Sequence, residues 1–255
     1  KSMRICKGKT KHSGSARQET LDTLFQGRLK VVQRKGGYRF SIDTLLLAHF
    51  VKVQGREKIV DLGAGNGVIP LMLAFLYPAV RVVGLEIQEE MVQRALRSVS
   101  LNRLRERVEI LLGDVRSVKE LFPPQSFDVA ICNPPYRGAA SGRINPDPEK
   151  RVARHEIKGQ LMDFLRAGSY LLPRGGRIAL VYPATRMPDL LLAMRQAAIE
   201  PKRLRLVHSF EGAAATLVLA EGIKGAGSEL KILPPLVVYT KERQYAPEIR
   251  AMLGV

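Results

Sequence analysis

The sequence predicts an α/β fold, a doubly wound and mostly parallel seven-stranded sheet with an antiparallel hairpin at its edge. From Lys58 onward, five short apolar stretches rich in β-branched residues alternate with amphipathic stretches. Apolar strands separated by helices are typical of a parallel sheet that is covered on both faces. Two further strand-like stretches near the carboxyl end have no helix between them, which indicates an antiparallel pair.

The elements of this sheet follow one another along the chain. Strands are predicted at residues 58–62, 81–86, 108–113, 127–132 and 177–182. Helices are predicted at residues 67–76, 88–101, 115–121, 157–171 and 187–199. The edge hairpin consists of RLRLVHS (203–209) and ATLVLAEGI (215–223), which brings the number of strands to seven.

The chain ahead of the first parallel strand predicts an arm and an extension. Residues 1–18 are polar and basic without apolar periodicity, which is typical of a flexible arm. Residues 19–56 predict a hairpin around Gly36-Gly37, followed by a helix near residues 43–52. We expect this extension to belong to one domain that covers residues 19–255.

Composition and charge restrict the function. The net charge of +17 favours a polyanionic partner such as a nucleic acid, because basic side chains that neutralise phosphates release counterions. Two cysteines exclude a disulfide framework, and no Cys/His cluster has the spacing of a metal site. No apolar run is long enough for a membrane span. We therefore expect a cytoplasmic protein without a metal.

A glycine-rich turn follows the first parallel strand. The segment VDLGAGNGVIP places Asp61 before Gly63, Gly65 and Gly67, and residues without a Cβ allow the backbone to bend sharply and approach a ligand. The segment is not a dinucleotide fingerprint, because Val68 stands where the third glycine would fall. It is not a P-loop either, because no Lys-Ser/Thr pair follows.

Acidic residues end the first three parallel strands. Asp61, Glu86 and Asp114 should all lie at the carboxyl edge of the sheet, where doubly wound folds bind their ligands. Glu86 suits the two hydroxyls of a ribose, and Asp114 suits an adenine amino group. Acids repel phosphates, so the implied ligand is an adenosine that carries a cationic amino-acid group, and S-adenosylmethionine fits. Helix capping is the alternative role of such acids, and it stays open for Asp114.

The fourth strand runs into Asn133-Pro134-Pro135-Tyr136. Proline has no backbone N–H, so this loop offers acceptors without competing donors. The Asn133 side chain and the Pro134 carbonyl can receive the two hydrogens of an exocyclic amine, and Tyr136 can stack on its ring. Such acceptors favour the charge that develops when the amine attacks a methyl group. A proline-stiffened loop with a packed tyrosine is the alternative.

These motifs together resemble the class I S-adenosylmethionine-dependent amino-methyltransferases that act on adenine N6 or glutamine N5. Further segments, among them ETLDTL, YRFSIDTLLLAHF, GLEIQEEM and LPPLVVY, are similar to the bacterial family that methylates N6 of adenine 37 in valine tRNA. The resemblance implies a Rossmann-like fold and a tRNA substrate. It implies cofactor binding by Asp61, Gly63, Gly65, Glu86 and Asp114, and acceptor binding by Asn133, Pro134 and Tyr136.

Substrate contacts are also expected from flanking segments. YRFSIDT, which contains Phe40, would border the methionine end of the cofactor. Residues 137–156 form a long basic segment punctuated by glycine and proline, and such segments are often functional. It supplies the remaining candidate RNA contacts, which are Arg137, Arg151, Arg154 and His155.

Three other functions remain open from the sequence. A glutamine-N5 protein methyltransferase would use the same Asn-Pro-Pro-Tyr chemistry, but it usually carries a helical amino-terminal domain. A guanine-N2 rRNA methyltransferase commonly has phenylalanine where this chain has Tyr136. A non-catalytic RNA-binding protein would not need intact cofactor and acceptor motifs.

Overall fold

A computed structural model describes residues 19–35, 41–135 and 161–254. The described helices are α1 (Ile42–Phe50), α2 (Val68–Leu76), α3 (Glu89–Leu101), α4 (Val118–Leu121), α6 (Leu161–Leu171), α7 (Met187–Gln196) and α8 (Pro247–Leu253). Two 3-10 turns, η2 (Val115–Ser117) and η3 (Ala184–Arg186), precede α4 and α7. The predicted arm at residues 1–18 lies outside the described residues.

The described strands form a hairpin and one large sheet. The hairpin pairs β1 (Glu19–Leu24) with β2 (Leu29–Arg34). The large sheet contains β3 (Lys58–Leu62), β4 (Arg81–Glu86), β5 (Val108–Leu112), β6 (Val129–Cys132), β7 (Arg177–Pro183), β8 (Ile199–His208), β9 (Ala215–Lys224), β10 (Lys231–Ile232) and β11 (Leu236–Val237).

The large sheet has the order β10-β8-β9-β7-β6-β3-β4-β5, and β11 also pairs with β8. Strands β3 to β7 are parallel to one another, whereas β9 runs antiparallel to both β7 and β8. The predicted seven strands are all present. The two-residue strands β10 and β11 were not predicted, because Pro234 and Pro235 between them interrupt the apolar pattern.

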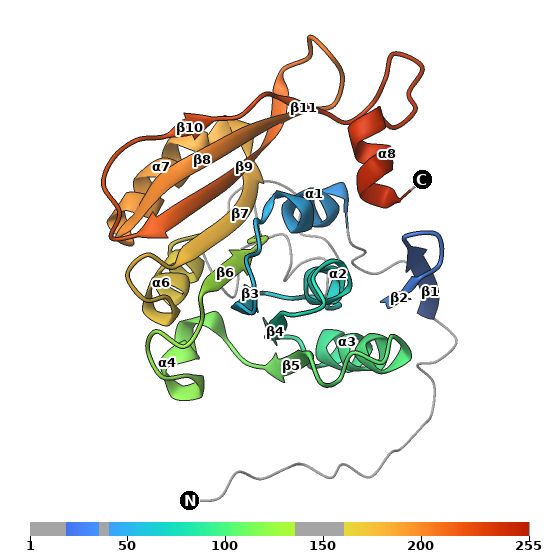
Figure 1. Cartoon of the computed structure of the whole chain (residues 1–255), viewed down its shortest axis with the longest axis vertical. Helices are drawn as coiled ribbons and strands as arrows, with labels where there is room; N and C mark the ends of the chain where they lie inside the picture. The colour runs from blue at the N-terminus through green and yellow to red at the C-terminus, as the bar shows by residue number, and fades with distance from the viewer. Residues whose placement is uncertain (1–18, 36–40, 136–160, 255) are drawn as a thin grey trace, which may run out of the picture.

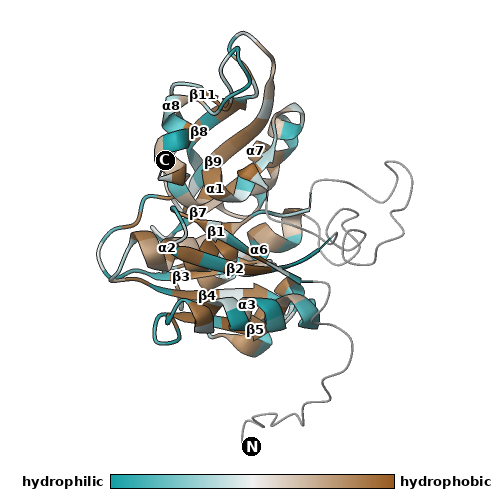
Figure 2. Cartoon of the chain, turned by 90° about the vertical axis from the view of Figure 1, so that its right-hand side faces the viewer, coloured by the Kyte–Doolittle hydropathy of each residue, from teal (hydrophilic) through white to brown (hydrophobic). Residues whose placement is uncertain are grey.

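Side chains of the central strands β3 and β6 alternate between the two faces of the sheet and pack into two separate cores. Ile59 and Ile131 pack with α1, α2 and α8, whereas Val60 and Ala130 pack with α6 and α7. In Figure 1, α1, α2 and α3 accordingly lie on one side of the central strands, and α4 and α6 on the other. Figure 2 shows the central strands and α2 mostly in the hydrophobic colour. The predicted double winding is therefore confirmed.

The amino-terminal hairpin turns at residues 25–28, not at the predicted Gly36-Gly37 pair, which lies outside the described residues. Phe25, Gln26 and Gly27 all have positive φ values, at 52°, 57° and 85°. The prediction followed the glycine pair. The turn contains a single glycine, and its two other left-handed residues are not of a type that marks a turn.

This hairpin is joined to α3 by side chains that bond the backbone of β2. The Lys30 N–H donates to Asn102 Oδ1 at 2.9 Å, and the Asn102 amide donates to the Lys30 carbonyl at 2.6 Å. The Val32 N–H donates to Ser98 Oγ at 2.9 Å. Backbone groups on the open edge of β2 are thus hydrogen-bonded by side chains of a helix instead of by a third strand.

Helix α7 ends three residues earlier than predicted. Ala198 has a left-handed φ of 58°, and β8 starts at Ile199, so this last residue of the predicted helix already belongs to the sheet. The predicted helix at 115–121 is divided into η2 and α4. The predicted helix at 157–171 corresponds to α6, whose expected first residues lie outside the described part of the chain.

Two arginines fasten the carboxyl end of α1 to the sheet. Arg203 of β8 donates to the Phe50 carbonyl at 2.5 Å, and its Cζ lies 4.3 Å from the centroid of the Phe50 ring. Arg177 of β7 donates to the Lys52 carbonyl at 2.5 Å. Glu221 of β9 lies 3.4 Å from Arg203 and 4.0 Å from Arg177, and its carboxylate balances their charge. We call these residues the α1 clasp.

Candidate active site

The strand order changes direction between β3 and β6. Strands β4 and β5 continue the sheet on one side and β7 on the other, so the carboxyl ends of β3 and β6 flank the switch point. Leu62 and Cys132, the last residues of these strands, are paired. The glycine-rich turn and Asn133, which follow them, therefore start side by side at the place where such folds bind ligands.

The glycine-rich turn adopts a backbone that only glycine enters without strain. Gly63 and Gly67 have φ values of 81° and 77°. The N–H groups of Gly63 and Ala64 donate to the Leu85 carbonyl at 2.8 and 3.0 Å, which ties the turn to β4. A Cβ on Gly67 would lie 2.9 Å from the Ala95 Cβ, so α3 packs directly against this position.

The carboxylate of Asp61 is buried at this turn. Asp61 is 1% exposed, and neither carboxylate oxygen has a hydrogen-bond partner among residues 19–35, 41–135 and 161–254. Burial, and next the nearby Glu86 carboxylate, raise the pKa of Asp61 to about 8. A buried acid without a partner is costly, and a cationic ligand group would relieve that cost.

Glu86 holds the turn from the end of β4. It is 5% exposed and accepts hydrogen bonds from the Gly65 N–H at 2.8 Å and the Gln88 N–H at 2.9 Å. Burial raises the pKa of Glu86, while these backbone donors lower it. Each carboxylate oxygen has a second lone pair, so this arrangement is compatible with the predicted ribose contact.

Asp114 caps a 3-10 turn. Its Oδ1 accepts from the Arg116 N–H at 2.9 Å, and its carboxylate also pairs with the Arg116 guanidinium. The alternative reading of Asp114 as a cap thus describes its observed contacts. The predicted adenine contact stays a prediction.

A small pocket joins the turn to the acceptor loop. Asn133 is half-buried and lines this pocket together with Asp61, while Pro134 behind it is buried. The other lining residues come from the glycine-rich turn, from α2 and from α1, and they are Thr44, Gly63, Ala64, Gly65, Asn66, Val68 and Ile69. The structure therefore brings Asp61, Gly63, Gly65 and Asn133 to one cavity.

Six of the predicted site residues lie outside the described part of the chain. They are Phe40, Tyr136, Arg137, Arg151, Arg154 and His155. Thr44, the last residue of the YRFSIDT segment, is described, and it lines the pocket.

Two residues near the site were not predicted. Asn66 is 4% exposed and accepts from the buried Arg94 Nε at 3.2 Å, which connects the turn to α3. Phe164 of α6 lies over the turn, because a Cβ on Gly63 would be 3.1 Å from its ring. Asn66 stands inside the glycine pattern and could have been chosen from the sequence, whereas nothing in the apolar spacing of α6 distinguishes Phe164.

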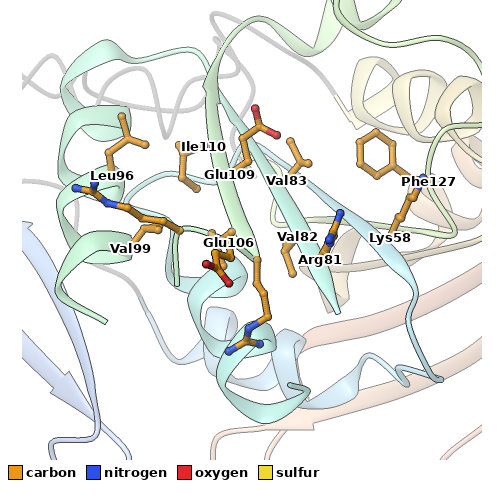
Figure 3. Close-up of a pocket in the computed structure, with 13 residues that line it drawn as sticks. Lys58, Arg81, Val82, Val83, Leu96, Val99, Glu106, Glu109, Ile110 and Phe127 are labelled. Atoms are coloured by element: carbon orange, nitrogen blue, oxygen red, sulfur yellow. The ribbon is translucent and has the colours of Figure 1, made fainter. Parts of the chain in front are cut away.

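A wider hollow lies at the opposite edge of the sheet (Figure 3). It is formed by the amino ends of β3, β4 and β5, and its side chains include Lys58, Arg81, Leu96 and Glu109. None of the predicted site residues that the structure describes lines it. Of the predicted site residues, Asp61, Gly63, Gly65 and Asn133 line the smaller pocket at the carboxyl edge.

Residues 19–35, 41–135 and 161–254 contain no group of three His, Cys, Asp or Glu side chains that could hold a metal ion. No described helix is both long enough and apolar enough to cross a membrane.

Comparisons with known proteins give one consistent family. A family model described as the methyltransferase small domain matches residues 38–192. The tRNA1(Val) (adenine(37)-N6)-methyltransferase of Porphyromonas gingivalis is 30% identical over 197 residues, which cover 75% of this chain and 76% of that protein. The protein of the same name from Tolumonas auensis is 27% identical over 222 residues, covering 86% of this chain and 90% of its own.

Solved structures agree on the fold. A predicted O-methyltransferase from Agrobacterium tumefaciens superposes with a TM-score of 0.68 at 25% identity, covering 82% of this chain and 94% of that chain. TrmN from Thermus thermophilus superposes with a TM-score of 0.51 at 23% identity, covering 71% of this chain and 48% of its own. The Rossmann-like fold expected from the resemblance is confirmed.

Proposed function

This chain belongs to the methyltransferase small domain family, and on that premise we propose that it transfers a methyl group from S-adenosylmethionine to N6 of an adenine in tRNA, adenine 37 of valine tRNA. The observation that carries the proposal is the pocket at the switch point. It joins Asp61, a buried acid suited to a cation, to Asn133 of an Asn-Pro-Pro segment suited to an amine.

The cofactor side of the pocket fits S-adenosylmethionine. The cofactor supplies an electrophilic methyl group on a positively charged sulfur and also carries an ammonium group. Asp61 and Glu86 are acids on this side of the site, and their ionised forms favour such a ligand over a phosphate-bearing one. The glycine turn lets the backbone come close, and we assign Glu86 to the ribose and Asp114 to the adenine.

The acceptor side orients and activates the amine. The Asn133 side-chain oxygen and the Pro134 carbonyl would accept the two hydrogens of an exocyclic NH2. This holds the nitrogen in place and stabilises the positive charge that it gains during attack. A hydroxyl group has one hydrogen and would leave one acceptor unsatisfied, so the pair favours an amine. Tyr136 is assigned to stacking on the target base.

An RNA substrate is supported by charge and by the relatives. A net charge of +17 suits a polyanion, and the relatives from Porphyromonas gingivalis and Tolumonas auensis are both named for adenine 37 of a valine tRNA. An adenine in a loop is already partly unstacked, so a pocket receives it at lower cost than a base in a duplex. The proposal requires no metal and places the enzyme in the cytoplasm with its tRNA.

Methylation of two matched transcripts tests the proposal. Valine tRNA with adenine at position 37 and the same tRNA with guanine there would each be incubated with enzyme and labelled cofactor. Mass spectrometry of the digested nucleosides should show N6-methyladenosine from the first transcript and no methylated nucleoside from the second. Label in a glutamine-containing release-factor peptide or in rRNA, with none in either tRNA, would overturn the proposal.

A further inference from the structure

Three aromatic rings form a row at the carboxyl edge of the sheet, away from the pocket. Tyr239 and Tyr245 stack with ring centroids 5.4 Å apart and planes 17° apart. Phe210 lies on the other side of the row, with its centroid 5.7 Å from that of Tyr239. We call these three residues the aromatic row. Tyr239 packs against the core, whereas Tyr245 is 39% exposed.

The topology places the aromatic row on the same edge as the acceptor loop. Strand β8 ends at His208 and β11 runs parallel to it, so Phe210 and Tyr239 both follow strands that end at the carboxyl edge. The loop after β8 and the loop before α8 both lie at the upper end of Figure 1. With about 4.8 Å between neighbouring strands, four spacings separate β6 from β11, or about 19 Å.

The loop that carries Tyr245 is held in one shape. Tyr239 and Tyr245 form an antiparallel bridge, and the Thr240 N–H donates to the Gln244 carbonyl at 2.8 Å. Helix α8 follows directly and is anchored to β8, because Arg205 makes a bidentate pair with Glu248 at 2.6 and 2.8 Å. A ring presented on such a rigid support loses little entropy when it binds a ligand.

The charge around Tyr245 suits a phosphate backbone. Lys241 and Arg243 are exposed in the tight turn between the two tyrosines. Glu242 in the same turn has a lowered pKa, because its carboxylate accepts a hydrogen bond from Thr240. The turn therefore presents two cations against one acid beside an exposed ring. Basic side chains interleaved with aromatic rings are typical of surfaces that bind single-stranded nucleic acid.

We propose that the aromatic row is a second RNA-binding site, at which Tyr245 stacks on an unpaired base of the substrate while Lys241 and Arg243 contact its phosphates. The inference rests on the proposed function, since it concerns the same RNA. A stacked strand advances about 3.4 Å per nucleotide, so 19 Å corresponds to about five or six nucleotides from the target adenine. The ligand of this site is thus a neighbouring part of the same RNA loop or stem end.

A pair of substrates separates this second site from the pocket. The first is an anticodon stem-loop that contains the target adenine, and the second is a trinucleotide centred on the same adenine, too short to reach Tyr245. Tyr245→Ala should raise KM for the stem-loop about tenfold, as expected for the loss of one base–aromatic stack, and leave KM for the trinucleotide unchanged. Tyr245→Phe keeps the ring and should behave like the wild type with both substrates.

Leu96→Ala provides a matched control. Leu96 is 40% exposed, close to the 39% of Tyr245, and lies at the hollow on the opposite edge (Figure 3). This variant should leave both KM values unchanged. Thermal melting and cofactor affinity of all variants would show whether Tyr245→Ala acts through the fold instead.

The outcomes distinguish the two proposals. An unchanged stem-loop KM in Tyr245→Ala, or an equal rise for both substrates, would overturn the second site while wild-type methylation of RNA still supports the proposed function. Absence of RNA methylation by the wild-type enzyme would overturn the proposed function itself. In that case direct binding of the unmodified stem-loop, compared between wild type and Tyr245→Ala, still tests the aromatic row.

Discussion

The carboxyl edge of the sheet is built in two contrasting ways on the two sides of the switch point. Over β3 and β4, the side chains that can bind a ligand are acids that are almost completely buried, with Asp61 1% and Glu86 5% exposed. Over β6 to β11, they are a half-buried amide, exposed cations and an aromatic ring that is 39% exposed. The first region is enclosed by backbone, and the second faces solvent.

This difference matches two kinds of ligand. A small cationic cofactor gains from complete enclosure, because burial strengthens its attraction to an acid. A large RNA cannot be enclosed, and it is bound by contacts spread over a surface. We therefore expect changes on the β3–β4 side to alter cofactor affinity, and changes on the β6–β11 side to alter turnover or RNA affinity. The following predictions test that separation.

The largest effect should come from Asn133→Ala. The Asn133 oxygen is proposed to act mainly in the transition state, so kcat should fall by about 100-fold or more. Although Asn133 lines the pocket, cofactor affinity should stay nearly unchanged, as measured by calorimetry. A large loss of cofactor affinity with unchanged kcat would show that Asn133 binds the cofactor and does not act in the transition state.

Glu86→Ala should show the opposite pattern. Loss of the proposed ribose bonds, and of the contact to the Gly65 N–H at 2.8 Å, should weaken cofactor binding by about 1–3 kcal/mol. RNA affinity, measured by filter binding without cofactor, should not change. Glu86→Gln retains an acceptor and should lose less affinity than Glu86→Ala. Equal losses of RNA affinity and of cofactor affinity in Glu86→Ala would contradict the separation of the cofactor side from the RNA side.

Cofactor affinity should rise with pH between about 6 and 8. Burial and Glu86 raise the pKa of Asp61 to about 8, so in the free protein this carboxyl is protonated below that pH, whereas a cation is bound by the ionised form. The gain should approach about tenfold per pH unit and level off above pH 8. The other groups that face Asp61 are Glu86 and the thiol of Cys132.

Asp61→Asn tests the source of this pH dependence. The variant should bind the cofactor more weakly at pH 8 and should lose most of the slope between pH 6 and 8. Calorimetry in buffers of different ionisation enthalpy would count the released protons directly. A slope that persists in the variant would assign the titration to another group, with Glu86 the first to examine.

The smallest effect should come from single surface cations. Arg243→Gln removes one proposed phosphate contact and should reduce the slope of log affinity against log salt by about 0.7–0.9. Arg81→Gln removes the same charge at the opposite edge of the sheet and serves as the matched control. Equal slopes for the two variants would mean that the positive charge acts as a general field and not as a defined contact.

The sequence was most informative where the backbone itself dictates the pattern. Five parallel strands and the turn at Gly63, Gly65 and Gly67 follow from apolar runs and from positions that need left-handed φ values. It was least informative where tertiary packing decides. The hairpin turn at Phe25–Arg28 uses non-glycine residues with positive φ, and the Phe164 ring reaches Gly63 from a helix about one hundred residues later.

The candidate site shows the same limit. Asp61, Glu86 and Asn133 could be chosen because they lie at the carboxyl ends of strands, but their burial and contacts could not be predicted from spacing. Asp114 illustrates this, since its carboxylate is engaged by the Arg116 N–H and guanidinium. Tyr239 ends the LPPLVVY segment, but nothing in that segment indicates a partner six residues later, and the stacking of Tyr239 on Tyr245 depends on a bridge between these two residues.

The α1 clasp determines when during synthesis the pocket can be completed. Thr44 of α1 lines the pocket, yet Arg203, which holds the other end of α1, leaves the ribosome about 150 residues after Phe50. A nascent chain that already contains the glycine turn and Asn133 therefore still lacks the fastening of one pocket wall. Pulse proteolysis of a ribosome-bound chain that ends at Ala198, and so lacks Arg203, should cleave near α1, and protection there would show that the wall forms without the Arg203 contact.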